Sequence, residues 1–244
     1  MTGTLALVGG AAWTEGCSFD AELLRVSGGD RVVVIPTAAA YEQPRAVVET
    51  ATAWFGQLGA SVEAVWALRR SDALAPGVAD PVRDARFVYI SGGSPMHLRS
   101  VLKDTPLWDA IVDCWHRGGV VAASGEAAAV LCTHMVDNRG GAFTVGLDLL
   151  DGITVIPRFG QWSGDKLHRT VRLAPHHVTV VGIDERTALI WEDGSWRTEG
   201  AGTVGVFVDG HRVELDAVPS GGGGAGVTST PLGASRDPSL LRTR

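Results

Sequence analysis

The chain has 244 residues, of which 45% are hydrophobic and 20% are charged, and its formal net charge is −6. This length and composition are typical of a soluble globular protein with one sizeable core. The acidic balance, together with the lack of a lysine- and arginine-rich run, excludes nucleic acid as an expected partner.

The sequence gives no sign of a targeting signal or of a membrane span. The start, Met1–Thr4, lacks a basic region ahead of an apolar one, so no signal peptide is expected. No apolar run reaches membrane-spanning length. The three cysteines, Cys17, Cys114 and Cys132, are scattered, which is typical of a reducing cytoplasm. We expect a cytoplasmic protein without a metal or other cofactor.

Apolar segments alternate with segments of helical periodicity through the first half of the chain. Strands are expected at residues 5–10, 31–37, 62–67, 87–90 and 120–123. Helices are expected at residues 20–25 and 44–58, through 98–101, and at 107–116. This order predicts a parallel sheet with right-handed crossovers and helices on both faces.

Residues 118–131 contain a strand, a sharp turn and a helix of small residues in direct succession. The strand is expected at Val120–Ala123, the turn at Ser124-Gly125, and the helix from Glu126 onward. Such an order forms a nucleophile elbow, a turn that lifts one side chain to the top of a parallel sheet. The small neighbours that an elbow needs are present, but the residue expected at the tip is Gly125.

The second half of the chain has a different character. Further strands are expected at residues 153–156 and 178–183. Asp193-Gly194 and Asp209-Gly210 each separate two strand-like runs, which is typical of hairpins with two-residue turns. We therefore expect the parallel sheet to end in a small antiparallel extension. The glycine-, serine- and proline-rich end predicts an α/β domain over residues 1–217 and a disordered tail over residues 218–244.

Four short segments in sequence order carry a resemblance to a known family. They are residues 8–10, 91–95 (Ser-Gly-Gly-Ser-Pro), 118–131 and 182–189 (Gly-Ile-Asp-Glu-Arg-Thr-Ala-Leu). Together they resemble peptidase family S51, which includes dipeptidase E, cyanophycinase and type 1 glutamine amidotransferase-like proteins. The resemblance implies a flavodoxin-like, class I glutamine amidotransferase-like α/β fold. It also implies a serine hydrolase with a histidine base and a peptide-like substrate.

Two positions depart from what the resemblance implies. With no gap in the alignment of residues 118–131, the elbow serine falls on Gly125. The strand that ends at Pro157 places Arg158 where the family has its histidine. A serine mechanism needs a hydroxyl and a base within hydrogen-bond reach, and on this alignment the chain has neither. The absence of both the serine and the histidine predicts that this chain no longer uses the serine mechanism that the resemblance implies.

Glu126, Ser124 and Arg158 are the candidate catalytic residues. Glu126 is expected to be an acid, a base or an anchor for a substrate ammonium, although a negative charge in the first turn of a helix is also favoured by the helix dipole alone. Arg158 is expected to pair with Glu126, to bind a substrate carboxylate or to lie ion-paired on the rim. Ser124 is the alternative nucleophile, if the turn shifts by one residue.

Substrate contacts are expected at the carboxyl ends of the strands, because open α/β sheets bind ligands there. The candidate substrate-binding residues are Gly92, Gly93, Ser94, Gly125, Trp162 and His168. Trp13, Glu15 and Cys17 are expected to form one wall of the cleft, and His168 is a candidate replacement for the missing base.

Three functions are open on the sequence. The first is a repurposed enzyme that acts on a small amino-acid- or peptide-like substrate through Glu126 and Arg158. The second is a non-catalytic ligand sensor or partner subunit, and the third is a serine peptidase that uses Ser124. The expected partner is a small-molecule or peptide-like substrate, with neither nucleic acid nor membrane, and assembly as a homodimer is left open.

Overall fold

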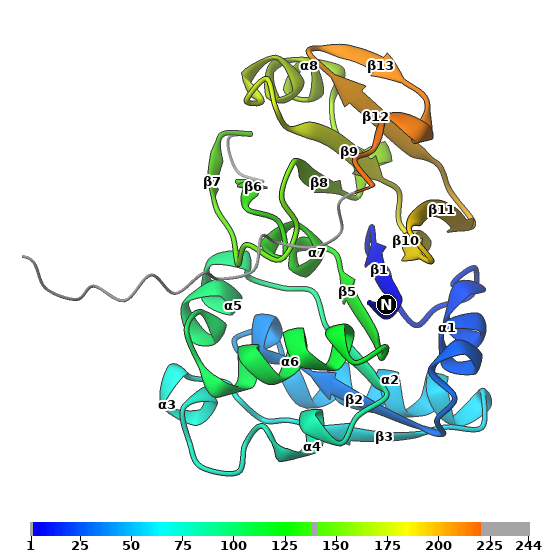
Figure 1. The fold of residues 1–244 in the computed structure, drawn as a ribbon, viewed down its shortest axis with the longest axis vertical. Helices are drawn as coiled ribbons and strands as arrows, with labels where there is room; N and C mark the ends of the chain where they lie inside the picture. The colour runs from blue at the N-terminus through cyan, green and yellow to red at the C-terminus, as the bar shows by residue number, and fades with distance from the viewer. Residues whose placement is uncertain (1, 138–140, 221–244) are drawn as a thin grey trace, which may run out of the picture.

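The structure is a computed structural model and describes residues 2–137 and 141–220 (Figure 1). The first half alternates strands and helices as predicted. Its strands are β1 (Leu5–Val8), β2 (Arg31–Ile35), β3 (Ser61–Ala64), β4 (Phe87–Ile90) and β5 (Val120–Ser124). Its helices are α1 (Phe19–Ser27), α2 (Pro44–Gln57), α3 (Arg70–Ala73), α4 (Asp80–Arg83), α5 (Pro95–Leu102), α6 (Pro106–His116) and α7 (Glu126–Val130), with the short 3-10 helix η1 (Thr37–Ala39). Within the described residues, no helix has the length and apolar character that crossing a membrane requires.

The main sheet has seven strands in the order β11-β10-β1-β5-β4-β2-β3. The five strands of the first half pair in parallel. The edge strands β10 (Thr187–Glu192) and β11 (Ser195–Gly200) pair antiparallel to β1 and to each other. The predicted α/β fold, a largely parallel sheet with an antiparallel extension, is confirmed.

Alternate residues of β5 pack against different helices. Val121 and Ala123 belong to the core that also contains buried residues of α5, α6 and α7. Val120 and Ala122 belong to a second core with Phe19 of α1 and Phe55 of α2. All four β5 residues are at most 1% exposed, because helices cover both faces of the sheet. The sheet is therefore a buried layer, and its upper edge, where the strands end, is the part open to ligands.

The second half forms a separate sheet, which the sequence did not predict. Its strands are β8 (Ile153–Pro157), β9 (Thr179–Ile183), β12 (Val204–Val208) and β13 (His211–Val213), in the order β13-β12-β9-β8. Helix α8 (Gly164–Leu173) joins the parallel strands β8 and β9, and this sheet lies above the main one in Figure 1. The second hairpin, β12 and β13, joins this sheet through β12, which pairs antiparallel with β9. A further antiparallel pair, β6 (His134–Val136) and β7 (Phe143–Val145), was also not predicted.

Both predicted hairpin turns are confirmed. Asp193 and Gly194 have φ values of 48° and 83°, and Asp209 and Gly210 have values of 47° and 85°. Two successive residues with positive φ are the mark of a type I′ turn, whose twist matches that of the flanking strands.

The folded part extends past the predicted boundary at residue 217. Val218, which follows the short helix η3 (Leu215–Ala217), is 3% exposed. The carbonyl of Pro219 accepts a hydrogen bond from Trp196 Nε1 at 2.9 Å. Residues 218–220 therefore belong to the domain, and the rest of the predicted tail lies outside the described residues.

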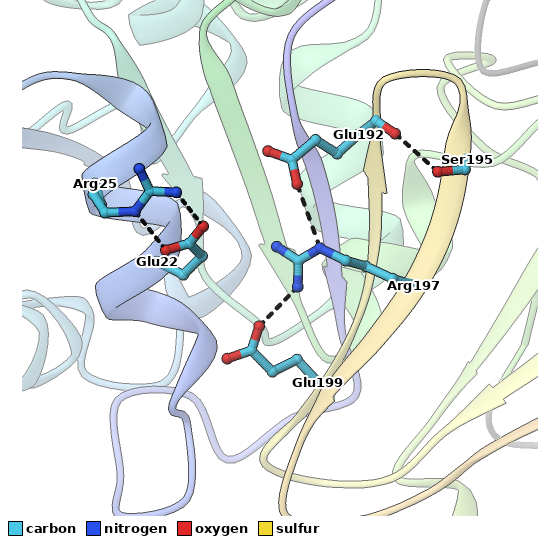
Figure 2. A network of polar contacts seen from close by, with 6 residues as sticks. All are labelled: Glu22, Arg25, Glu192, Ser195, Arg197 and Glu199. Carbon is cyan, nitrogen blue, oxygen red and sulfur yellow. Dashed lines mark hydrogen bonds and ion pairs between the residues drawn. The ribbon is translucent and has the colours of Figure 1, made fainter.

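Charged side chains line the edge of the main sheet where α1 approaches β11 (Figure 2). Arg197 donates hydrogen bonds to Glu199 at 2.8 Å and to Glu192 at 3.4 Å, and Glu22 pairs with Arg25 on α1. Partly exposed pairs of this kind contribute little to stability individually. The more important effect is that Glu199 carries a negative charge next to α1.

Candidate active site

Gly125 lies at the tip of the turn between β5 and α7. Its φ and ψ are 58° and −130°, a conformation that residues with a Cβ rarely adopt. Its N–H donates to the carbonyl of Val8 at 2.8 Å, which fixes the turn against β1. The predicted succession of strand, turn and helix is thus present at β5, Gly125 and α7. The tip residue has no side chain, so it offers no nucleophile.

Ser124 is the last residue of β5 and not the tip. It pairs with Val8 of β1, while Ala123 before it pairs with Ile90 of β4. Ser124 is 4% exposed and lines the cleft. A shift of the turn by one residue would reverse which β5 side chains face each core, so the pairing with two neighbouring strands fixes this register.

Glu126 and Arg158 form an ion pair at the tip of the elbow. Nη2 of Arg158 donates to Oε1 of Glu126. The side chain of Glu126, the first residue of α7, is 10% exposed, whereas that of Arg158 is 45% exposed. The carboxylate is therefore well shielded from water, and the guanidinium reaches it from the rim. The structure brings together the two residues that the sequence singled out.

The backbone around Arg158 positions this guanidinium. Arg158 follows β8 with φ 50° and ψ 43°, and its N–H donates to the carbonyl of Gly9 at 2.8 Å. Within the next helical turn, η2 (Phe159–Gln161), the N–H of Gly160 donates to Oδ1 of Asp184 at 2.7 Å. Oδ2 of Asp184 accepts from the N–H of Thr203 at 2.9 Å. Asp184 thus holds the loop that carries Arg158.

The ion pair lies in a cleft of about 470 Å³ at the carboxyl edge of the main sheet. The lining residues come from the ends of β1, β4, β5 and β8 and from the segment after β2. They are Gly10, Ala11, Ala12, Trp13, Glu42, Val47, Thr50, Ser91, Gly92, Gly93, Ser124, Gly125, Glu126 and Arg158. This volume lies within the range of roughly 300–1,000 Å³ that small-molecule sites occupy.

Glu42, Val47 and Thr50 were missed by the sequence analysis. They lie just before α2 and in its first two turns. The available signal was Pro44, which marks the start of a helix that follows a parallel strand. Such helix starts lie at the same edge of the sheet as the ends of the strands, so the first turns of α2 belong to the cleft.

Several predicted contacts lie elsewhere. Ser94 accepts a hydrogen bond from the N–H of His97 at the start of α5 and lines a neighbouring cavity. Trp162 and His168 do not line the cleft. Trp162 packs with the hydrophobic cluster of the second sheet, with the ammonium of Lys166 3.8 Å from its ring centre, and His168 is exposed on α8. Both residues lie away from the cleft because η2 and α8 pack on the second sheet, which the sequence did not predict.

Only one of the three residues expected to form a wall, Trp13, lines the cleft. Glu15 is exposed outside it, and Cys17 is 1% exposed. Burial raises the pKa of the Cys17 thiol, so this cysteine is not activated as a nucleophile. Within the described residues, no group of three or more histidine, cysteine, aspartate and glutamate side chains is arranged to hold a metal ion.

Asp20 is a buried acid near Tyr89, the residue that packs against Trp13 of the cleft. The ring of Trp13 packs against that of Tyr89 with centroids 4.9 Å apart and planes tilted by 57°, and burial, followed by the charge of Asp20, raises the pKa of the Tyr89 phenol. Asp20 is 0% exposed and accepts a hydrogen bond from Trp54 Nε1 at 2.9 Å. Burial raises the pKa of this carboxyl to about 8, with a smaller contribution in the same direction from Glu199. The burial of Asp20 was not predicted from the sequence, because an acid in the first turn of a helix normally faces solvent.

Comparison with known proteins places this geometry in a family. The model of peptidase family S51 matches residues 5–198. The cyanophycinases of Trichormus variabilis and Synechococcus elongatus are 26% and 27% identical over 186 and 195 residues. These matches cover 71% and 74% of this chain but 61% and 59% of the relatives, so the chain spans about three fifths of the length of the curated relatives it matches.

A solved structure agrees with the family match. The crystal structure of a peptidase from an acI-B1 actinobacterium superimposes with a TM-score of 0.78 at 29% identity. The superposition covers 87% of this chain and 93% of that one. The family model itself reaches from β1 through the elbow and the Arg158 loop to β11. On this match, which extends over most of its length, the chain belongs to peptidase family S51.

Proposed function

We propose that this S51 protein binds a small amino-acid- or peptide-like molecule noncovalently in its cleft, with Glu126 and Arg158 as the charged anchors. The observation that carries the proposal is the ion pair beside a tip residue without a side chain. Gly125 supplies no nucleophile, and a carboxylate next to it opposes the negative charge that would develop in acyl transfer. The same two charges suit a ligand that carries one charge of each sign.

The chemistry of the two side chains determines which end of the ligand each of them would contact. A guanidinium has five N–H donors in a planar fork, so Arg158 retains donors for a ligand carboxylate beyond those that meet Glu126. The carboxylate of Glu126 accepts hydrogen bonds and suits an ammonium. An amino acid or a short peptide presents both groups a few bonds apart.

Catalysis without a covalent intermediate is compatible with this arrangement. The neighbouring guanidinium stabilises the ionised form of Glu126, and an ionised carboxylate is a base and not an acid. In a repurposed hydrolase, Glu126 would accept a proton from a water that adds to the carbonyl carbon of the ligand's amide, and would return it to the amine that leaves when the C–N bond breaks. In a non-catalytic sensor it would remain an anchor only. Mass spectrometry of bound ligands after incubation distinguishes the two, because only the enzyme changes the mass of its ligand.

Binding of amino acids and dipeptides, measured by isothermal titration calorimetry, tests the proposal. We expect Glu126→Gln and Arg158→Met each to weaken binding about tenfold or more, because each removes one charged anchor. Glu15→Gln, which changes an exposed acid outside the cleft, is the control and should bind as the wild type does. The proposal is wrong if no zwitterionic compound binds, or if both cleft variants keep the affinity of the wild type.

Ser124 supports a second candidate function, because its side chain lines the same cleft as the ion pair. A serine peptidase would react with a fluorophosphonate probe at this residue. We expect no adduct by mass spectrometry, since Ser124 lies before the tip of the elbow. An adduct in the wild type that is lost in Ser124→Ala would replace our proposal with serine chemistry.

A further inference from the structure

A second cavity of about 340 Å³ adjoins the cleft. Glu42, Gly93 and Glu126 line both, so the two cavities meet at the carboxylate of the ion pair. The remaining lining residues are Ser94, Pro95, Met96, Met135, Val136 and Asp137. This cavity extends from the charged centre in a direction that the function proposed above leaves unused.

The walls of the second cavity are mainly apolar. Pro95 and Met96 come from the first turn of α5, and Met135 and Val136 come from β6. Met135 is 1% exposed, whereas Met96 is 46% exposed, which is high for a large apolar side chain. Methionine is unbranched and polarisable, so it adapts its shape to apolar ligand groups. One buried methionine and one exposed methionine thus form a floor and an adjustable wall.

The acids that line this cavity have cations beside them outside its lining, because Arg158 is ion-paired with Glu126 and Lys166 interacts electrostatically with Asp137. Its lining acids are Glu42, Glu126 and Asp137, and no lysine or arginine lines it among the described residues. A ligand group with a second carboxylate would be repelled there. An uncharged apolar group would instead exchange water for contact with Pro95, Met96 and Met135.

We propose that the second cavity is a subsite for a large apolar side chain of the same ligand. This inference rests on the proposed function and names its ligand class: an amino acid or dipeptide whose N-terminal side chain is large and uncharged. The ammonium lies at Glu126, where the two cavities meet, and the carboxyl end lies toward Arg158. The side chain nearest the ammonium then enters the cavity lined by Met96 and Met135.

Matched dipeptides that differ only at the N-terminal residue test the subsite. Isothermal titration calorimetry compares Gly-Ala, Leu-Ala, Met-Ala, Lys-Ala and Glu-Ala against the wild type. We expect Leu-Ala and Met-Ala to bind about tenfold more tightly than Gly-Ala, and Glu-Ala to bind most weakly. Equal affinities for Gly-Ala and Leu-Ala, or the tightest binding by Lys-Ala, would overturn the subsite.

The variant Met96→Gln removes the apolar wall with nearly the same side-chain length. We expect it to reduce the preference for Leu-Ala over Gly-Ala by about threefold or more, while Gly-Ala binds as before. Leu74→Gln is the matched control, because Leu74 is 48% exposed and lines neither cavity. If Gly-Ala and Leu-Ala bind equally, the subsite alone fails. If no dipeptide binds, the proposed function fails together with it.

Discussion

Replacing Asp20 with asparagine is expected to remove the loss of stability that burial of this acid causes as the pH rises from about 4 to about 8. Asp20 is fully buried, and its Oδ1 has no hydrogen-bond partner among the described residues. Burial raises the pKa of its carboxyl from the ordinary value of 3.8 to about 8, and the nearby charge of Glu199 acts in the same direction. The hydrogen bond from Trp54 opposes this shift but does not cancel it.

The direction of the pH effect follows from the proton balance. Between the unfolded and the folded pKa, the folded state holds a proton on Asp20 that the unfolded state has released. The stabilising effect of this proton is therefore complete at low pH and is lost as the pH rises to about 8. At about 1.4 kcal/mol for each pH unit between the two pKa values, the loss is on the order of 6 kcal/mol at most. An asparagine keeps an acceptor for Trp54 and has no charge to bury.

Urea unfolding at several pH values between about 5 and 9 measures this effect. The free energy of unfolding of the wild type should fall relative to that of Asp20→Asn as the pH rises. Asp84→Asn, which changes an exposed acid, is the control and should run parallel to the wild type. Parallel curves for wild type and Asp20→Asn would show that Asp20 is not the buried acid described above.

Gly93→Ala is expected to cost about 3 kcal/mol or more of stability and to disrupt the cleft. Gly93 has a φ of 141°, and a Cβ there would lie 2.3 Å from the carbonyl oxygen of Ala38. That oxygen also accepts the N–H of Ser94 at 2.8 Å, so the loop cannot move away without losing a hydrogen bond. Because Gly93 lines both cavities, a displaced loop also changes the walls of the binding site.

Gly118→Ala is a matched control for this experiment. Gly118 also has a positive φ, 89°, but a Cβ there would meet no atom within 4 Å. It therefore reports the cost of the backbone conformation alone, about 1 kcal/mol. Thermal and urea unfolding of the two variants separate the steric clash from the conformational cost. Equal losses would mean that the Ala38 carbonyl can move aside.

The elbow and its ion pair could be predicted because their signals are local. A run of buried residues ending at Ser124, followed by Gly125 and small helix formers, is compatible with few structures besides a strand, a tight turn and a helix. The end of β8 at Pro157 likewise places Arg158 at the carboxyl edge. Each side chain thus follows the carboxyl end of a strand, but their contact depends on how the two sheets that contain β5 and β8 pack together.

The second sheet could not be predicted because strand pairing is not a local property. The turns at Asp209-Gly210 and Asp193-Gly194 have the same chemistry, yet one hairpin extends the main sheet and the other joins β9. Nothing in either turn specifies which edge is free. The positions of Trp162 and His168 outside the cleft depend on this second sheet, so the sequence did not indicate them.

The burial of Asp20 shows that the sequence alone does not tell which charged residues of a helix are buried. Two acids, Asp20 and Glu22, lie in the first turn of α1, and helix periodicity does not say which of them faces the sheet. The answer depends on where Trp54 of α2 places its Nε1 donor. That position is fixed by the packing of two helices on one face of the sheet.

The ion pair also connects the two sheets. Glu126 follows β5 of the main sheet, and Arg158 follows β8 of the second one. Folding therefore already orders the two side chains that the ligand is proposed to meet, so binding has little conformational entropy left to lose at these positions. A zwitterion that enters between them replaces one ion pair with two. Affinity then reflects the difference between these pairings, and the connection between the sheets is maintained through the bound molecule.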